Sequence, residues 1–149
     1  MILGYKKRFP WGSETNFKRK ILEDIKKHSL RTDRKNRWIT GRKIQHAHGV
    51  RTKQYDHFQN GECKSVQHIV IEELTVDTLE PDHFYIYDYQ INGKPDIKGF
   101  RILVDDRVLS WEEIITLSRN DGFDTVQDFF RWFFDGFDGK IIHFTDLKY

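Results

Sequence analysis

The residues between Lys26 and Lys43 concentrate groups that can bind an anion. This stretch holds one acid, Asp33, and eight basic side chains: Lys26, Lys27, Arg31, Arg34, Lys35, Arg37, Arg42 and Lys43. One aromatic residue, Trp38, and several small hydroxyl and amide side chains lie among them. Cations attract phosphate and an aromatic ring can stack on a base, so the mixture suits a phosphate-bearing ligand such as a nucleotide or RNA. A solvated, lysine-rich loop is the alternative interpretation.

Charge is divided unevenly along the sequence. Residues 1–54 carry 16 Lys and Arg and 4 Asp and Glu, a net charge of +12, whereas residues 55–149 carry the other 9 and 19, a net charge of −10. If the halves fold onto different faces, the resulting dipole steers a polyanion to the basic side. If they face each other, surface ion pairs neutralise the excess, and each pair contributes little.

Two other groups of side chains are candidates for binding. Arg51 adds a cation, and Trp11 is presented by an irregular segment because Pro10 excludes a helix there. Trp11 can stack on a base or pack beneath its own loop. His46 and His48 fall on one side of an expected strand, but no third ligand at a recognisable spacing completes a metal site. We therefore expect neither a metal nor a cofactor.

The elements that position these residues follow from hydrophobic periodicity. Strands are predicted over residues 2–5, 44–50, 63–76, 84–91, 97–104 and 140–144, and residues 51–62 are expected to be irregular. An amphipathic helix over 15–25 leads directly to Lys26, and beyond it Ser29 and Arg31 share one face if the chain is extended. Ser110 opens a second helix with a capping box, and Asp124 is expected to cap a third, aromatic-rich helix.

The whole sequence predicts a single domain over residues 1–149, of the α+β class, built as a small mixed β-barrel flanked by about three helices. An aromatic content of 15% indicates a globular chain. A doubly wound nucleotide-binding fold is disfavoured because no Gly-rich phosphate turn follows a strand. There is no long apolar segment, and the single cysteine, Cys63, cannot form an internal disulfide, so we expect a cytoplasmic protein without a membrane partner.

Three segments together resemble the ASCH domain, a family of the PUA-like superfamily of small β-barrels. The run from Lys26 to Arg31 is similar to that family's Lys-x-x-Thr-x-Arg motif. The other two are the Arg37-Trp38-Ile39-Thr40-Gly41 turn before a strand and the Asp121-Gly122-Phe123-Asp124 turn with the aromatic helix after it. The resemblance spans most of the chain.

The resemblance implies a cleft, lined by residues 26–31, that receives RNA, a nucleotide or a modified nucleoside. Some small bacterial ASCH proteins are amidohydrolases that remove the acetyl group from acetylated cytidine. Lys26 and Ser29 would match their catalytic Lys and Thr, and Asp121 would stand near their catalytic Glu. The chain departs from the family at two of these positions, with Ser in place of Thr and Asp in place of Glu.

Two functions are therefore predicted, and the binding function is the leading one. In it, the domain captures RNA or a nucleotide with the residues Lys26, Arg31, Arg34, Arg37, Trp38 and Arg51. The alternative is a nucleoside amidohydrolase that uses Lys26, Ser29 and Asp121. The net charge of +12 favours binding, because an uncharged nucleoside cannot use so many cations. An aromatic surface for a protein partner is a third, less specific interpretation.

Overall fold

The computed structural model describes residues 1–74, 84–91 and 94–149, and it describes side chains for residues 1–74 and 98–149. The helices are α1 (Phe17–Leu22), α2 (Trp111–Asn120) and α3 (Val126–Trp132). The strands are β1 (Ile2–Tyr5), β2 (His28–Arg31), β3 (Lys43–His48), β4 (Asp56–Glu62), β5 (Ser65–Leu74), β6 (Phe84–Ile91), β7 (Lys94–Val104), β8 (Arg107–Val108) and β9 (Phe137–His143). The fold is α+β, as predicted.

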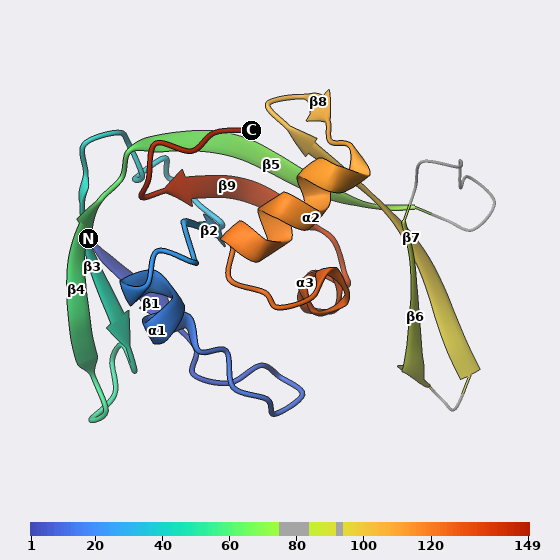
Figure 1. Cartoon of the computed structure of the whole chain (residues 1–149), viewed down its shortest axis with the longest axis horizontal. Coiled ribbons are helices and arrows are strands. Elements are labelled where there is room, and N and C mark those ends of the chain that lie inside the picture. Colours follow the sequence, from blue (N-terminus) through green and yellow to red (C-terminus); the bar gives the residue numbers. More distant parts are fainter. Residues whose placement is uncertain (75–83, 92–93) are drawn as a thin grey trace.

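The strands of the described residues form two sheets (Figure 1). The smaller sheet has the order β1-β3-β4, in which β1 runs parallel to β3. The larger sheet has the order β2-β9-β5-β7-β6, and β8 pairs with β7. Hydrogen bonding between strands does not join the two sheets into a closed barrel, so the expected barrel is not confirmed.

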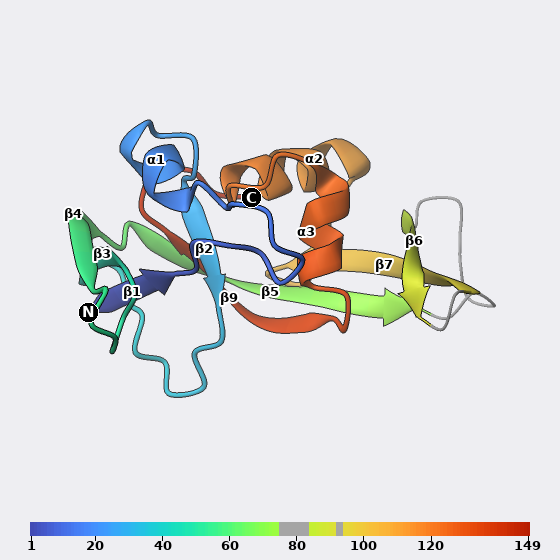
Figure 2. The same ribbon diagram turned by 90° about the horizontal axis from the view of Figure 1, so that it is seen from below.

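The helices lie on one side of the strands, and the loop between β2 and β3 lies on the opposite side (Figure 2). The core between the helices and the larger sheet combines aliphatic side chains with a cluster of aromatic rings. Phe100 of β7 stacks on Phe130 of α3 with ring centroids 4.9 Å apart, and Phe129 meets Phe123 edge to face at 5.4 Å. This packing confirms the predicted apolar face of the third helix, because Phe129 and Phe130 are almost fully buried.

Several local predictions are confirmed and others are wrong. Ser110 and Glu113 form the predicted capping box of α2. The cap of α3 is Thr125, whose hydroxyl accepts from the Asp128 N–H at 3.1 Å, and not Asp124. The Asp124 carboxylate instead accepts from the buried Lys20 ammonium at 2.8 Å. The segment expected to be irregular contains β4, because its backbone pairs with β3 although its side chains lack a clear apolar alternation.

Two buried imidazoles, His46 and His143, make the fold sensitive to acid. Burial lowers the pKa of His46 to about 4 and that of His143 to about 3. As the pH falls, the unfolded chain therefore binds protons on these two imidazoles before the folded chain does. The contribution of the neutral imidazoles to the free energy of unfolding is complete above about pH 6.5 and is lost as the pH falls toward about 4.

We expect the free energy of unfolding, measured with urea, to fall between about pH 7 and about pH 5, above the range in which ordinary carboxylates titrate. The variant His46→Gln keeps a neutral hydrogen-bonding group next to Tyr5 and should lose part of this dependence. His57→Gln, at an exposed histidine, is the control. An unfolding free energy that stays constant over this range would contradict the prediction.

Candidate functional site

A small cavity of about 160 Å³ brings together the residues that the sequence singled out for chemistry. Its lining includes Lys26, Ser29, Arg31 and Asp121. We call it the lysine pocket. The remaining lining residues are Gly4, Tyr5, Lys6, Phe17, Leu30, Phe123, Trp132 and Phe133. The pocket therefore lies where β1, α1, β2 and the segment from the end of α2 through α3 meet, and apolar rings form much of its wall.

Lys26 is held in the pocket by Asp121. Its Nζ donates to Asp121 Oδ1 at 2.9 Å and to the backbone oxygen of the same residue, and it lies 4.6 Å from the centroid of the Phe17 ring. The side chain is only 2% exposed. Burial lowers the pKa of Lys26 to about 8, even though the Asp121 carboxylate favours the charged form. An amine with this pKa can gain or lose a proton near neutral pH.

Asp121 reaches Lys26 because helix α2 ends there in a tight turn. Gly122 has φ of +93°, and a Cβ at that position would lie 3.0 Å from Lys26 Cδ and from the Phe17 ring. Glycine is therefore required by both backbone conformation and space. Burial would raise the pKa of the Asp121 carboxyl, but Lys26 and His28 hold it below the usual range, so the group is a carboxylate.

Ser29 and Arg31 reach the same pocket from alternate positions of β2. Ser29 is 2% exposed, and within the described part of the chain its hydroxyl has no hydrogen-bond partner. Arg31 donates from one guanidinium nitrogen to Gly4 O at 2.5 Å and lies over the Tyr5 ring, 5.4 Å from its centroid. Arg31 is thus fixed by β1, whereas the Ser29 hydroxyl is free to act on a ligand.

His28 and Tyr149 lie behind Asp121 and were not predicted. Asn120 Nδ2 donates to the Tyr149 hydroxyl at 3.0 Å, so the hydroxyl proton is left to donate to His28 Nε2 at 2.7 Å. Burial lowers the pKa of His28, so the ring is neutral and its single proton is on Nδ1. That nitrogen lies 3.4 Å from Asp121 Oδ1, which is long for a hydrogen bond. Nothing in the sequence signals Tyr149.

The predicted nucleic-acid-binding residues are dispersed. Lys26 and Arg31 are in the lysine pocket. Arg34 and Arg37 are exposed on the β2–β3 loop, on the side of the sheets away from the helices (Figure 2). Arg51 is exposed on the β3–β4 loop.

Neither tryptophan considered for stacking presents a free ring. Trp38 is only 5% exposed and belongs to the core, so its ring is not available to a base. The backbone N–H groups of Trp38 and Arg37 donate to the carboxylate of Asp33, the single acid of the basic stretch. Trp11 stacks on Phe9 with ring centroids 4.8 Å apart, and the Arg131 guanidinium lies over the Trp11 ring, 4.5 Å from its centroid.

Many cations of the basic half are already paired with carboxylates. Besides Lys26 with Asp121, these pairs are Arg8 with Glu14, Lys18 with Asp56, Arg19 with Glu23, Lys20 with Asp124 and Lys43 with Glu62. Four of these six carboxylates come from the acidic half, and they are Asp56, Glu62, Asp121 and Asp124. The net charge of +12 therefore overstates the number of cations available to a polyanion.

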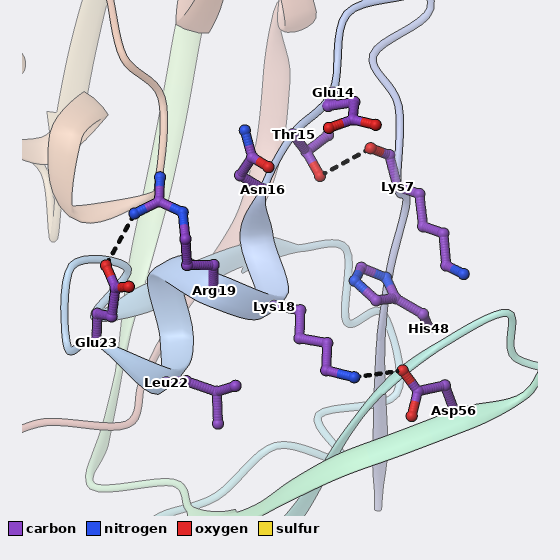
Figure 3. A pocket seen from close by; sticks show the side chains of 10 residues that line it. All are labelled: Lys7, Glu14, Thr15, Asn16, Lys18, Arg19, Leu22, Glu23, His48 and Asp56. Atoms are coloured by element: carbon purple, nitrogen blue, oxygen red, sulfur yellow. Dashed lines mark hydrogen bonds and ion pairs between the residues drawn. The ribbon is translucent and has the colours of Figure 1, made fainter.

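A wider cavity of about 480 Å³ opens beside α1 (Figure 3). The Lys18–Asp56 and Arg19–Glu23 pairs, each 2.8 Å apart, lie along its wall. Asn16 and Leu22 complete the part contributed by the helix. Because the charges on this wall neutralise each other, the cavity offers less for a charged ligand than the lysine pocket does.

No protein-family model, curated protein or solved structure matches this chain. None of the helices in the described residues is long and apolar enough to cross a membrane. Over the same residues, no group of three His, Cys, Asp or Glu side chains is arranged to hold a metal ion. His46 and His48 instead make hydrogen bonds to the hydroxyl and the backbone oxygen of Tyr5, at 2.8 and 2.9 Å.

The variant Tyr149→Phe tests the network behind Asp121. It removes the hydroxyl that joins Asn120 to His28 and leaves two polar groups without this partner in a largely buried position. We expect a loss of about 1–3 kcal/mol in the free energy of unfolding, measured by chemical denaturation. The control is Tyr55→Phe, at an exposed tyrosine. Equal effects of the two variants would show that the network adds no stability.

Proposed function

We propose that the chain is a hydrolase that removes a small acyl group from an amine of a nucleoside, such as the acetyl group of acetylated cytidine. The observation that carries the proposal is that the Ser29 hydroxyl, which has no hydrogen-bond partner among the described residues, shares a pocket with Lys26, an amine whose pKa burial lowers to about 8. The resemblance to the ASCH domain supports the same reaction. The proposal includes that the two sheets correspond to the small β-barrel of the PUA-like superfamily.

The reaction begins with attack by Ser29 Oγ on the acyl carbonyl carbon, while neutral Lys26 takes the hydroxyl proton. The tetrahedral intermediate carries a negative oxygen, which the Arg31 guanidinium stabilises because two of its five N–H donors suffice for its bonds to Gly4 O and Leu30 O. The carbon–nitrogen bond then breaks, and protonated Lys26 returns the proton to the departing amine. Water then attacks the acyl-serine ester while Lys26 takes its proton. The bond between the acyl carbon and Ser29 Oγ breaks, the carboxylic acid leaves, and Lys26 returns the proton to Ser29 Oγ.

Asp121 has two effects on Lys26. Its carboxylate and backbone oxygen fix the direction of the ammonium group, so the amine loses little freedom when it acts. Its charge also opposes the effect of burial on the Lys26 pKa, which keeps that pKa near neutral rather than far below it. The pair thus places a base of suitable strength in the same pocket as the nucleophile.

Hydrolysis of acetylated cytidine by the purified protein is the direct test. Because only neutral Lys26 can accept the proton, kcat/KM should rise with pH and level off with a midpoint near the pKa of about 8. Ser29→Ala should lower kcat/KM by about 100-fold or more, because it removes the nucleophile. Ser29→Thr should retain activity.

The controls are Lys27→Ala and Ser65→Ala, which alter a neighbouring lysine and another buried serine outside the pocket. Both should turn over substrate at the parent rate. Parent activity in Ser29→Ala, or a rate that does not change between about pH 7 and about pH 9, would refute the assignment of nucleophile and base.

Binding of single-stranded RNA is the second candidate function, and one observation favours it. Arg34, Lys35 and Arg37 are exposed on the β2–β3 loop, and none has an ion-pair partner among the described residues. Three neighbouring unpaired cations suit contacts with successive phosphates. These cations do not line the lysine pocket, so they can bind RNA whether or not the pocket is catalytic.

A salt series separates this function from the first. The affinity for a short single-stranded RNA should fall as salt rises. Arg34→Ala with Arg37→Ala should weaken binding and reduce the slope by about 0.7 for each phosphate that the variant no longer neutralises. Arg19→Ala, at a cation already paired with Glu23, is the matched control. Binding that does not respond to salt, or to the paired substitution, would rule out this loop as the RNA-binding surface.

A further inference from the structure

The parallel pairing of β1 with β3 brings two basic segments to one edge of the smaller sheet. The last residues of the ladder, Tyr5 and His48, lie side by side, and both strands end there. Residues 6–8, which are Lys-Lys-Arg, leave β1 at the same edge at which residues 49–54 leave β3. Carboxyl ends of parallel strands are frequent ligand sites because the chains that follow them enclose a common space.

The two segments flank an open surface depression of about 580 Å³, which we call the edge cavity. Its lining residues are Gly4, Tyr5, Lys6, Lys7, Arg8, Gly49, Val50, Thr52 and Gln54. Three are cations and none is a carboxylate. Arg51 and Lys53 add two exposed cations on the loop that forms one wall.

The positive charge at this edge is incompletely neutralised. Arg8 lies 3.6 Å from Glu14, but both side chains are about two-thirds exposed, so the pair is weak. Asp56 is paired with Lys18 at 2.8 Å. Lys7 forms no ion pair with a described residue, although its charge helps to hold the pKa of the Asp56 carboxyl below the usual range. Its side chain extends away from Glu14 and α1 (Figure 3). An anion in the edge cavity therefore finds unused positive charge.

The loop wall of the cavity is already ordered by its own contacts. Thr52 Oγ1 donates to Gly49 O at 2.7 Å and accepts from Gln54 N at 3.1 Å. A Cβ on Gly49 would lie 2.4 Å from Gln54 O, and a Cβ on Gly4 would lie 2.8 Å from Val50 Cγ2, so the loop packs closely on itself and on β1. Because this loop is already ordered, it loses little conformational entropy when a ligand binds to it.

The edge cavity adjoins the lysine pocket, because Gly4, Tyr5 and Lys6 line both. A ligand whose acylated base fills the lysine pocket thus extends past Lys6 into a cationic space. We propose that the edge cavity is a phosphate-binding subsite, and that a nucleotide, free or within an RNA strand, is preferred as substrate over the uncharged nucleoside. The substrate assignment rests on the proposed hydrolase function, whereas the phosphate site does not.

The test compares cytidine, cytidine 5′-monophosphate and inorganic phosphate as ligands of the intact chain, with affinities from calorimetry and positions from backbone amide NMR shifts. We expect the monophosphate to bind about tenfold or more tightly than cytidine, since charge-assisted hydrogen bonds are added. Phosphate alone should shift the amides of residues 6–8 and 49–54. Lys7→Ala combined with Arg51→Ala should abolish the preference, and Lys148→Ala, at an exposed lysine near the end of the sequence, should preserve it.

Equal affinities for cytidine and its monophosphate, or phosphate shifts outside these residues, would overturn the subsite. Shifts at residues 6–8 and 49–54 by phosphate, without binding or turnover of any cytidine derivative, would support the subsite and reject the hydrolase proposal. A short RNA that binds more tightly than the monophosphate, and loses this advantage in Lys7→Ala with Arg51→Ala, would identify the strand as the source of the phosphate. Equal binding of the two would identify the free nucleotide.

Discussion

The buried contact between Lys26 and Asp121 is the interaction on which both the fold and the proposed chemistry depend. It joins the segment between α1 and β2 to the turn between α2 and α3, across 95 residues of sequence. Two charges removed from water are tolerated only when each satisfies the other, and removal of one partner from such a pair typically costs about 3–5 kcal/mol. The same contact fixes the amine that is proposed to act as base. Substitutions of Lys26 or Asp121 therefore change stability and chemistry together, which is why Ser29 is the more informative position.

The sequence predicts well those elements whose cause is local. The capping box at Ser110 and the aromatic face of α3 depend on residues within one or two helical turns, and both are present. Errors occur where a distant partner decides. Asp124 does not cap α3, and its carboxylate instead accepts from the ammonium of Lys20, which is 104 residues away. Strand β4 forms because its backbone pairs with β3. Neither partner can be read from the segment itself.

The candidate site was partly predictable for the same reason. Ser29 and Arg31 lie two residues apart on a strand, so their common face follows from strand geometry. That Asp121 approaches Lys26 depends on the tertiary fold, and only the ASCH resemblance suggested it. Tyr149 carries no local signal, because its role arises from hydrogen bonds to Asn120 and His28. The excess of basic residues overstated the available charge, since six of the 16 Lys and Arg side chains in residues 1–54 form ion pairs with carboxylates of the described residues.

The hydrogen bonds from Asn120 through Tyr149 to His28 run in one direction, because Asn120 Nδ2 donates to the Tyr149 hydroxyl and that hydroxyl donates to His28 Nε2. Burial lowers the pKa of His28 and raises that of Tyr149 and Tyr5, while Asp121 stays ionised. Each of these groups keeps one protonation state through the physiological range, whereas Lys26 does not. Of these groups, the Lys26 amine is therefore the one that gains or loses a proton near neutral pH, while the charges around it stay constant.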